Sequence, residues 1–360
     1  MTADATTAHD NRAAQGRPVE GEAVQVAGAP AIPGLRFRRL RIPGDFEAIA
    51  RIGNDGRIAD GVDWVQSAGQ VAAQMTPTGG FDPVADTVIA EVDGTCVAFV
   101  MTQWRLRDGM RTYTNDGAVL PAFRRRGLGR ALLRHGESRA RDIAAGHPDD
   151  LPKRHTNWGS DRETGLAALL EAEGYRPARW FFEMVRDPLD DLPEAPLPAG
   201  VELRPAAPAE LARIMAADNE AFRDHWGHAE ATSEDDARFL ANPDLRPELW
   251  SVGWDGDEVA GSVLVSVPED ENEQLGRRRG WLDHVTVRRP WRGKGLASAL
   301  MVASMRAMRH AGLTSAALGV DADSPTGAVR LYERLGFRTV DRSATWHKDM
   351  APRSDATGDG

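Results

Sequence analysis

Two basic, glycine-rich segments of this 360-residue sequence could bind a phosphate group. Residues 292–295 (RGKG) stand between an alternating apolar run and a stretch with helical periodicity, and residues 124–129 (RRRGLG) have the same setting. Small residues let a backbone approach a ligand closely, and the first amides of a helix attract anions. The pattern therefore predicts a pyrophosphate site on each turn, with an exposed, glycine-capped helix start as the alternative.

The two segments belong to a repeat that covers most of the chain. Residues 169–175 (LLEAEGY), which come after the first glycine-rich segment, match residues 331–337 (LYERLGF), which come after the second. The spacing changes between motifs, which places an insertion near 269–273 and another near 147–155, both in loop-like sequence. Self-similarity of this kind predicts two copies of one structural unit.

A proline-rich segment separates the two copies. We expect a linker at 189–200, an N-terminal domain at 35–188 and a C-terminal domain at 201–350. The tails, residues 1–34 and 351–360, show no apolar periodicity and are expected to be disordered.

The second copy predicts a mixed α/β fold with a mixed sheet. Apolar periodicity and turn residues indicate the following elements: strands at 201–206, 281–287 and 314–323, a hairpin over ELWSVGWD and EVAGSVLVSV, and helices at 209–222, 233–241, 296–311 and 328–336.

Composition narrows the class of protein. The chain has 54 acidic and 44 basic residues and a formal net charge of −10, which argues against nonspecific nucleic-acid binding. Its one cysteine excludes an intrachain disulfide and a cysteine-rich zinc site, and suits a cytoplasmic location. No apolar run is long enough for a membrane helix. We expect no metal, no nucleic-acid partner and no membrane contact, and either a monomer or a homodimer.

These motifs resemble the GNAT acetyltransferase superfamily. The resemblance rests on the R-x-x-G-x-G/A turn after a V-x-V strand and on the later L-Y-x-x-x-G-F segment, and two such domains in tandem are similar to the mycothiol synthases. It implies that two central strands splay apart and hold acetyl-CoA between them, with its pyrophosphate on the glycine turn. The implied cofactor residues are Val285, Val287, Arg292, Gly293, Lys294, Gly295, Leu296, Ala297, Ser298 and Ser324 in the second copy, and Val119, Arg124, Arg125, Arg126, Gly127, Leu128, Gly129 and Arg130 in the first. Ser324 stands where many members have Asn.

The resemblance also assigns catalysis to the second copy. Tyr332 occupies the position of the hydroxyl that protonates the departing thiolate in this family, and the alternative is a core aromatic on an amphipathic helix. Leu170 takes that position in the first copy and has no proton to give. The first copy is therefore expected to be non-catalytic, and either to bind acetyl-CoA or to serve a structural role.

The general base and the acceptor site are less constrained. Asp283 and His284 lie on the strand before the glycine turn, where a bulge can break the alternation of side chains, and a water chain is the third alternative. Four residues at the end of the first helix of the second copy and in the loop after it could line the acceptor site: Phe222, Asp224, His225 and Trp226. The alternative for Trp226 is a buried side chain that anchors this loop.

The predicted function is transfer of acetyl from acetyl-CoA to a primary amine of a small molecule. The alternatives are acetylation of a cysteinyl amino-sugar, as in mycothiol synthases, acetylation of an antibiotic or a protein, and, in another class, a non-catalytic acyl-CoA-binding module.

Overall fold

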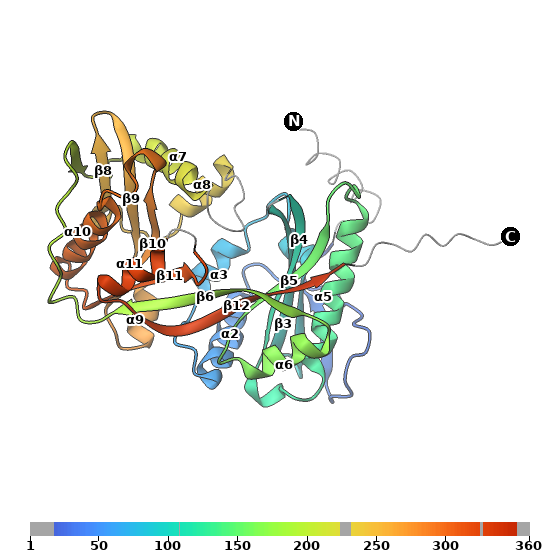
Figure 1. The fold of residues 1–360 in the computed structure, drawn as a ribbon. Helices are drawn as coiled ribbons and strands as arrows, with labels where there is room; N and C mark the ends of the chain where they lie inside the picture. Colours follow the sequence, from blue (N-terminus) through green and yellow to red (C-terminus); the bar gives the residue numbers. More distant parts are fainter. Residues whose placement is uncertain (1–17, 108, 224–231, 325–326, 351–360) are drawn as a thin grey trace. The chain divides into compact units, whose positions relative to one another are not determined.

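The computed structural model describes residues 18–107, 109–223, 232–324 and 327–350 (Figure 1). The predicted tails at 1–17 and 351–360 lie outside the described residues. No helix in the described part is both long and apolar enough to span a membrane.

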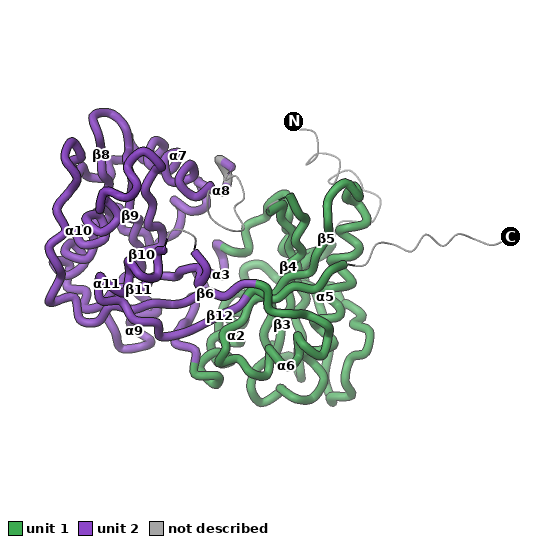
Figure 2. The backbone as a smooth tube through the Cα atoms, in the orientation of Figure 1, with its two compact units in different colours: residues 1–61, 74–178, 345–360 green, residues 62–73, 179–344 purple. Residues whose placement is uncertain are grey.

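The chain forms two compact units whose segments alternate along the sequence (Figure 2). Unit 1 consists of the described residues of 1–61, 74–178 and 345–360, and unit 2 of those of 62–73 and 179–344. The division of the sequence at 189–200 stays a prediction.

Unit 1 is a mixed sheet with helices. Its strands β1 to β4 pair in chain order as antiparallel neighbours, and β5 joins β4 in parallel. Its elements are β1 (Leu35–Arg39), α2 (Phe46–Asp60), α4 (Pro83–Asp86), β2 (Thr87–Val92), β3 (Thr95–Arg107), β4 (Met110–Val119), α5 (Leu128–Ala145), β5 (Lys153–Ser160) and α6 (Thr164–Ala172).

Unit 2 repeats this order. Strands β7 to β10 are antiparallel neighbours, and β11 joins β10 in parallel. Its elements are α3 (Ala68–Gln74), β7 (Val201–Arg204), α7 (Leu211–Phe222), α8 (Ser233–Leu240), β8 (Ser251–Asp255), β9 (Glu258–Ser266), α9 (Glu269–Gln274), β10 (Arg279–Val287), α10 (Leu296–His310), β11 (Ser315–Asp321) and α11 (Ala328–Arg334). The predicted mixed α/β fold and the second-half elements are confirmed.

The last strand of each half is shared between units. Strand β6 (Arg176–Arg186) closes the first half of the sequence, yet its residues 181–186 pair with β11 in unit 2. Strand β12 (Arg338–Asp349) ends in unit 1, where Lys348 forms an ion pair with Glu137 at 2.7 Å. Each unit therefore contains a strand that the other half of the sequence encodes.

In both units the central parallel strands separate after a short pairing. Strand β4 pairs with β5 only over 111–114, and β10 pairs with β11 only over 279–281. Both β4 and β10 continue for several residues beyond that point. The splayed strands implied by the family resemblance are confirmed.

Two local expectations are wrong. Residues 18–34 do not form a disordered tail, because the amide of Val24 donates to the carbonyl of Phe37 at 2.9 Å and Val26 is buried. This contact covers the edge of β1, whose backbone groups would otherwise lack partners. The acidic stretch 269–273 lies in helix α9 rather than in a loop. Glu269, Asp270 and Glu271 occupy the first turn, where the helix dipole favours them, and Glu271 bonds to Arg277 at 2.6 Å.

The unit 2 core should respond strongly to loss of volume. Leu264 on β9 is 0% exposed within the main apolar cluster of the unit. Leu264→Ala is expected to destabilise the protein by about 2–5 kcal/mol, from lost transfer energy and the cavity that remains. The measurement is denaturant unfolding. The matched control is Leu203→Ala on β7, where the side chain is 43% exposed; equal losses for the two variants would contradict this assignment of the core.

Candidate active site

The glycine turn of unit 2 presents bare main chain at the start of α10. Gly293 and Gly295 have φ angles of 73° and 85°, and open space surrounds the position of a Cβ atom on each. Gly295 is the N-cap of α10 and supplies no side-chain cap. The first-turn amides of a helix have no acceptor within the helix, and the helix dipole favours an anion there. Main-chain donors from Leu296, Ala297 and Ser298 are therefore suited to a phosphate.

Arg292 anchors the glycine turn to neighbouring backbone carbonyls. Its Nε donates to the carbonyl of Val287 at 2.8 Å, and its Nη2 donates to the carbonyl of Ala221 at 3.3 Å. Arg124 does the same in unit 1, where Nε donates to Val119 and Nη2 to Gly56. Each guanidinium thus bonds the turn to the end of a central strand and to the preceding helix. Lys294, in the glycine turn of unit 2, is exposed to solvent.

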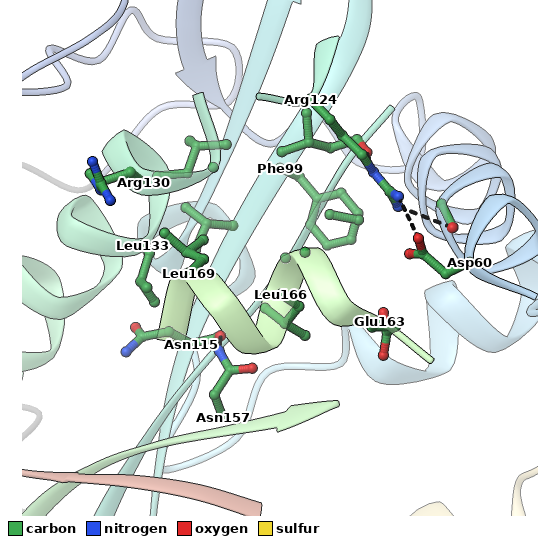
Figure 3. A pocket seen from close by; sticks show the side chains of 18 of the residues that line it. Asp60, Phe99, Asn115, Arg124, Arg130, Leu133, Asn157, Glu163, Leu166 and Leu169 are labelled. Atoms are coloured by element: carbon green, nitrogen blue, oxygen red, sulfur yellow. Dashed lines mark hydrogen bonds and ion pairs between the residues drawn. The ribbon is translucent and has the colours of Figure 1, made fainter. Parts of the chain in front are cut away.

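A cavity of about 500 Å³ opens at the corresponding turn of unit 1 (Figure 3). Glycines and apolar side chains form much of its wall, and Asn115 and Asn157 enter it from the two splayed strands. Its lining includes these residues of the predicted cofactor set: Val119, Arg124, Arg125, Gly127, Gly129 and Arg130. Of the others, Leu128 is buried at the start of α5 and the guanidinium of Arg126 lies 5.5 Å from the ring centre of Phe123.

The two turns differ in detail. Arg125 has a φ of 60° at the position that Gly293 holds in unit 2, so an ordinary residue adopts the left-handed conformation there. Glu163 also lines the unit 1 cavity, and burial raises the pKa of its carboxyl. Asp60 pairs with Arg124 at 2.8 Å at the edge of the cavity (Figure 3).

A bulge interrupts the pairing of β10 with β9 at Asp283. The register shifts between Leu282 and His284, as the sequence analysis expected for this strand. The side chain of Asp283 is exposed to solvent, although desolvation by the neighbouring protein raises the pKa of its carboxyl to about 6. A group that is reachable and still desolvated is in a position to exchange a proton with a ligand.

His284 forms a close pair with a carboxylate that sequence analysis missed. Its Nδ1 lies 2.6 Å from Oδ2 of Asp218, which is 0% exposed on α7. The hydroxyl of Thr286 donates to the other carboxylate oxygen at 2.9 Å, so the carboxylate is fixed. Burial lowers the pKa of His284, but the bond and charge of Asp218 outweigh it, and the net pKa is raised.

One feature of the sequence could have indicated Asp218. It occupies an apolar-face position of α7, among the buried residues Ile214, Met215 and Ala221. A carboxylate on the buried stripe of a helix needs a partner. That conflict could have flagged Asp218, although it could not have identified His284.

Aromatic rings hold the imidazole in place. The ring of Phe239 stacks on His284 and that of Phe222 meets it edge-on, each with ring centres 4.8 Å apart. Phe222, predicted as an acceptor residue, thus packs against the candidate base. Three further predicted acceptor residues, Asp224, His225 and Trp226, lie outside the described residues.

Tyr332 lies on α11, after the splayed strand β11. Its side chain is 7% exposed, and burial raises its pKa to about 12, so the phenol keeps its proton at neutral pH. Leu170, at the matching position of unit 1, is fully buried. Ser324 lies in the turn after β11, where its amide donates to the carbonyl of Asp321 at 3.1 Å.

The remaining predicted groups are on the backbone of β10. Val285 and Val287 pair with β9, whereas the pairing of β10 with β11 ends at Trp281. Amides on that open edge are suited to a ligand carbonyl. Within the described ranges, no group of three or more His, Cys, Asp or Glu side chains could hold a metal ion.

Comparison with known proteins gives one family. The model of the acetyltransferase (GNAT) family matches residues 67–148 and 211–337. A mycothiol acetyltransferase of Geodermatophilus obscurus is 29% identical over 312 residues, which cover 85% of this chain and 95% of that one. A mycothiol acetyltransferase of Salinispora tropica is 34% identical over 233 residues, which cover 61% and 68%.

Comparison with solved structures gives the same family. A GCN5-related N-acetyltransferase from Sphaerobacter thermophilus superposes with a TM-score of 0.69 at 30% identity, over 88% of this chain and 96% of that one. A tandem GNAT protein from the clavulanic acid biosynthesis pathway shares the fold, with a TM-score of 0.61 at 20% identity over 89% and 100%. With two matched regions, two glycine turns and two pairs of splayed strands, this chain belongs to the GNAT acetyltransferase family and is an acetyl-CoA-dependent N-acetyltransferase.

Proposed function

We propose that unit 2 transfers the acetyl group to a primary amine of a small molecule. The observation that carries this proposal is the Asp218–His284 pair beside the bulge of β10, at the point where β10 and β11 separate. The glycine turn at 292–295 would hold the pyrophosphate of acetyl-CoA, which directs its thioester along the open edge of β10.

The reaction requires two proton movements. The neutral amine attacks the thioester carbonyl carbon, the new C–N bond forms, and the C–S bond breaks as the amine proton leaves. Asp218 accepts a hydrogen bond from Nδ1–H of His284, which leaves Nε2 free to take that proton. Asp283 is the other candidate base, since a carboxyl with a pKa of about 6 is largely ionised at neutral pH. Tyr332 would give its proton to the departing CoA thiolate.

The acceptor class is supported by the relatives. Two of them, at 29% and 34% identity, are named mycothiol acetyltransferases. A cysteinyl amino-sugar, with a free α-amino group, is therefore our first candidate acceptor, ahead of antibiotics and protein lysines. We place the reaction in the cytoplasm, which suits the single cysteine, and expect a monomer or a homodimer.

For unit 1 we propose acetyl-CoA binding without transfer. Its cavity includes the glycine turn, which supports binding. Two features argue against chemistry there: Leu170 replaces the tyrosine, and β4 pairs with β3 without a register shift, so no residue is pushed out of the strand as Asp283 is in β10.

Loss of the Tyr332 hydroxyl should slow turnover. Tyr332→Phe keeps the buried ring and removes the proton, so kcat is expected to fall more than about tenfold, within the usual range for general acid catalysis. The dissociation constant for acetyl-CoA, measured by calorimetry, should change little. Unchanged turnover would reject the role of Tyr332 as acid.

The pH profile separates the two candidate bases. A base must be deprotonated, so kcat/KM is lost as the pH falls through its pKa: above 6.5 for His284, and near 6 for Asp283. Asp218→Asn removes the charge that raises the pKa of His284, so the acid limb should move to lower pH and the plateau should drop about 100-fold. The control is Glu220→Gln on the same helix, whose partner is Arg288. If Asp218→Asn leaves the limb where it is, His284 is not the base.

Matched substitutions test the two cofactor sites. Gly129 and Ala297 are corresponding residues in the first turns of α5 and α10. Gly129→Glu and Ala297→Glu each place a carboxylate where a phosphate would lie. We expect calorimetry to give two acetyl-CoA per wild-type chain and one per variant chain, with transfer lost only in Ala297→Glu. One acetyl-CoA per wild-type chain would show that unit 1 does not bind it.

A further inference from the structure

The cavity of unit 1 has a closed end, at the last pair of the parallel β4–β5 ladder. That pair is Thr114 with Thr156, whose hydroxyl oxygens lie 2.8 Å apart. Asn115 and Asn157 are the next residues on the two strands, and both line the cavity (Figure 3). The side-chain amide of Asn157 donates to the main-chain carbonyl of Asn115. The two asparagines therefore form the floor of the space between the splayed strands.

The side chain of Asn115 is held at one end and has an unused donor at the other. Its Oδ1 accepts from the hydroxyl of Thr102 at 3.0 Å, and the residue is 2% exposed. Its Nδ2 has no hydrogen-bond partner among the described residues. A Cβ atom on Gly136 of α5 would lie 2.6 Å from Oδ1, so glycine there leaves room for this side chain. A buried donor without an acceptor costs free energy, and a ligand that accepts from it in the cavity removes that cost.

A polar neighbour of this amide is the hydroxyl of Tyr175. Burial raises the pKa of that hydroxyl, and the amide of Asn115 opposes the effect. Neither Nδ2 of Asn115 nor the Tyr175 hydroxyl completes a hydrogen bond within the described part of the chain. Asn115 lines the cavity, whereas Tyr175 is buried outside its lining. The asparagine is therefore the one of the two that a ligand can reach.

Unit 2 has an apolar pair where unit 1 has Asn115 and Thr102. In each unit, one member of the pair stands on the partner strand, four positions beyond the residue that pairs with the valine before the glycine turn. That member is Thr102 in unit 1, opposite Asn115, and Val265 in unit 2, opposite Leu282. Leu282 and Val265 are 2% and 0% exposed. The fold thus accepts an apolar pair at this place, and the polar floor is a property of unit 1.

A ligand whose diphosphate lies on the glycine turn of unit 1 points its other end at this floor. The carbonyl of Val119, at the end of β4, accepts from Arg124 of the turn, and Asn115 lies four residues back along the strand. The ladder closes the space beyond Asn115, so the group that arrives there is the end of the ligand. In an acyl-CoA that end is the thioester. Its carbonyl oxygen is a hydrogen-bond acceptor, whereas the sulfur of a thiol is only a weak one.

We propose that Asn115 makes unit 1 selective for an acylated CoA over free CoA, because its Nδ2 donates to the carbonyl oxygen of the thioester at the closed end of the cavity. This inference rests on the proposed binding of acetyl-CoA by unit 1. Free CoA is the product of acetyl transfer, so unit 1 distinguishes the donor substrate from the spent product.

The test compares three ligands by calorimetry on the full-length Ala297→Glu variant, in which unit 2 is expected not to bind them. The ligands are acetyl-CoA, free CoA and S-ethyl-CoA, a thioether with a methylene group in place of the carbonyl. Acetyl-CoA is expected to bind about tenfold more tightly than either of the others, a loss typical of leaving a buried donor unpaired. Equal dissociation constants for acetyl-CoA and S-ethyl-CoA overturn the proposal, and this comparison needs no substitution in the floor.

Substitutions in the same background test the residue itself. The double variant T102V/N115L gives unit 1 the apolar pair of unit 2, so the core stays filled while the donor is lost. Its preference for acetyl-CoA over S-ethyl-CoA should fall to within about twofold. The control is Tyr175→Phe, which removes the neighbouring hydroxyl, keeps Asn115 and should retain the preference. A preference that survives in T102V/N115L, or one that disappears in Tyr175→Phe, overturns the proposal.

Failure of the proposed function gives a different result. No heat with any of the three ligands would show that unit 1 does not bind acetyl-CoA, and it would overturn both proposals for this unit. Binding of all three ligands with equal affinity overturns only the selectivity assigned to Asn115.

Discussion

The site depends on backbone groups of the sheet that lack hydrogen-bond partners on a neighbouring strand. Parallel strands that separate leave amides and carbonyls without ladder partners, and such groups are costly unless something satisfies them. In unit 2 the pairing of β10 and β11 stops after Trp281, and the strands continue apart. The open edge of β10 leads to the bare amides at the start of α10. A ligand with a carbonyl at one end and a diphosphate at the other, such as acetyl-CoA, would meet both requirements.

The two units show which parts of this arrangement are separable. Arg124 and Arg292 make equivalent bonds, and these bonds align Gly56 with Ala221, hence Gly53 with Asp218. The glycine turns and their arginine anchors are thus common to both halves, whereas the first half has Gly53 and Leu170 where the second has Asp218 and Tyr332. Binding geometry built from main chain tolerates changes in side chains, but a base and its orienting carboxylate are lost through a single substitution.

Sequence reasoning found the features that are local in the chain. The glycine turns and the strand with Asp283 and His284 lie within short motifs, and the family resemblance supplied the expected role of Tyr332. It missed Asp218, because the contact with His284 joins residues 66 positions apart. It also extended the disordered N-terminal tail too far, since the contact of Val24 with β1 is tertiary and leaves no periodicity. Helix α9 was missed because a short acidic run resembles a loop until Arg277 pairs with it.

The alternation of the two units along the sequence gives a physical reason for keeping the first half, which has Leu170 at the position of Tyr332. Strand β6 pairs with β11, and Val65 and Val71 of residues 62–73 are buried in unit 2, so the second half of the sequence alone does not make up the whole of this unit. In the other direction, Lys348 at the end of β12 neutralises Glu137, which is buried in unit 1. Leaving such a buried charge unpaired is strongly destabilising. The first half of the sequence therefore stays structurally necessary to unit 2 whatever its own chemistry, because it supplies a strand of that unit's sheet.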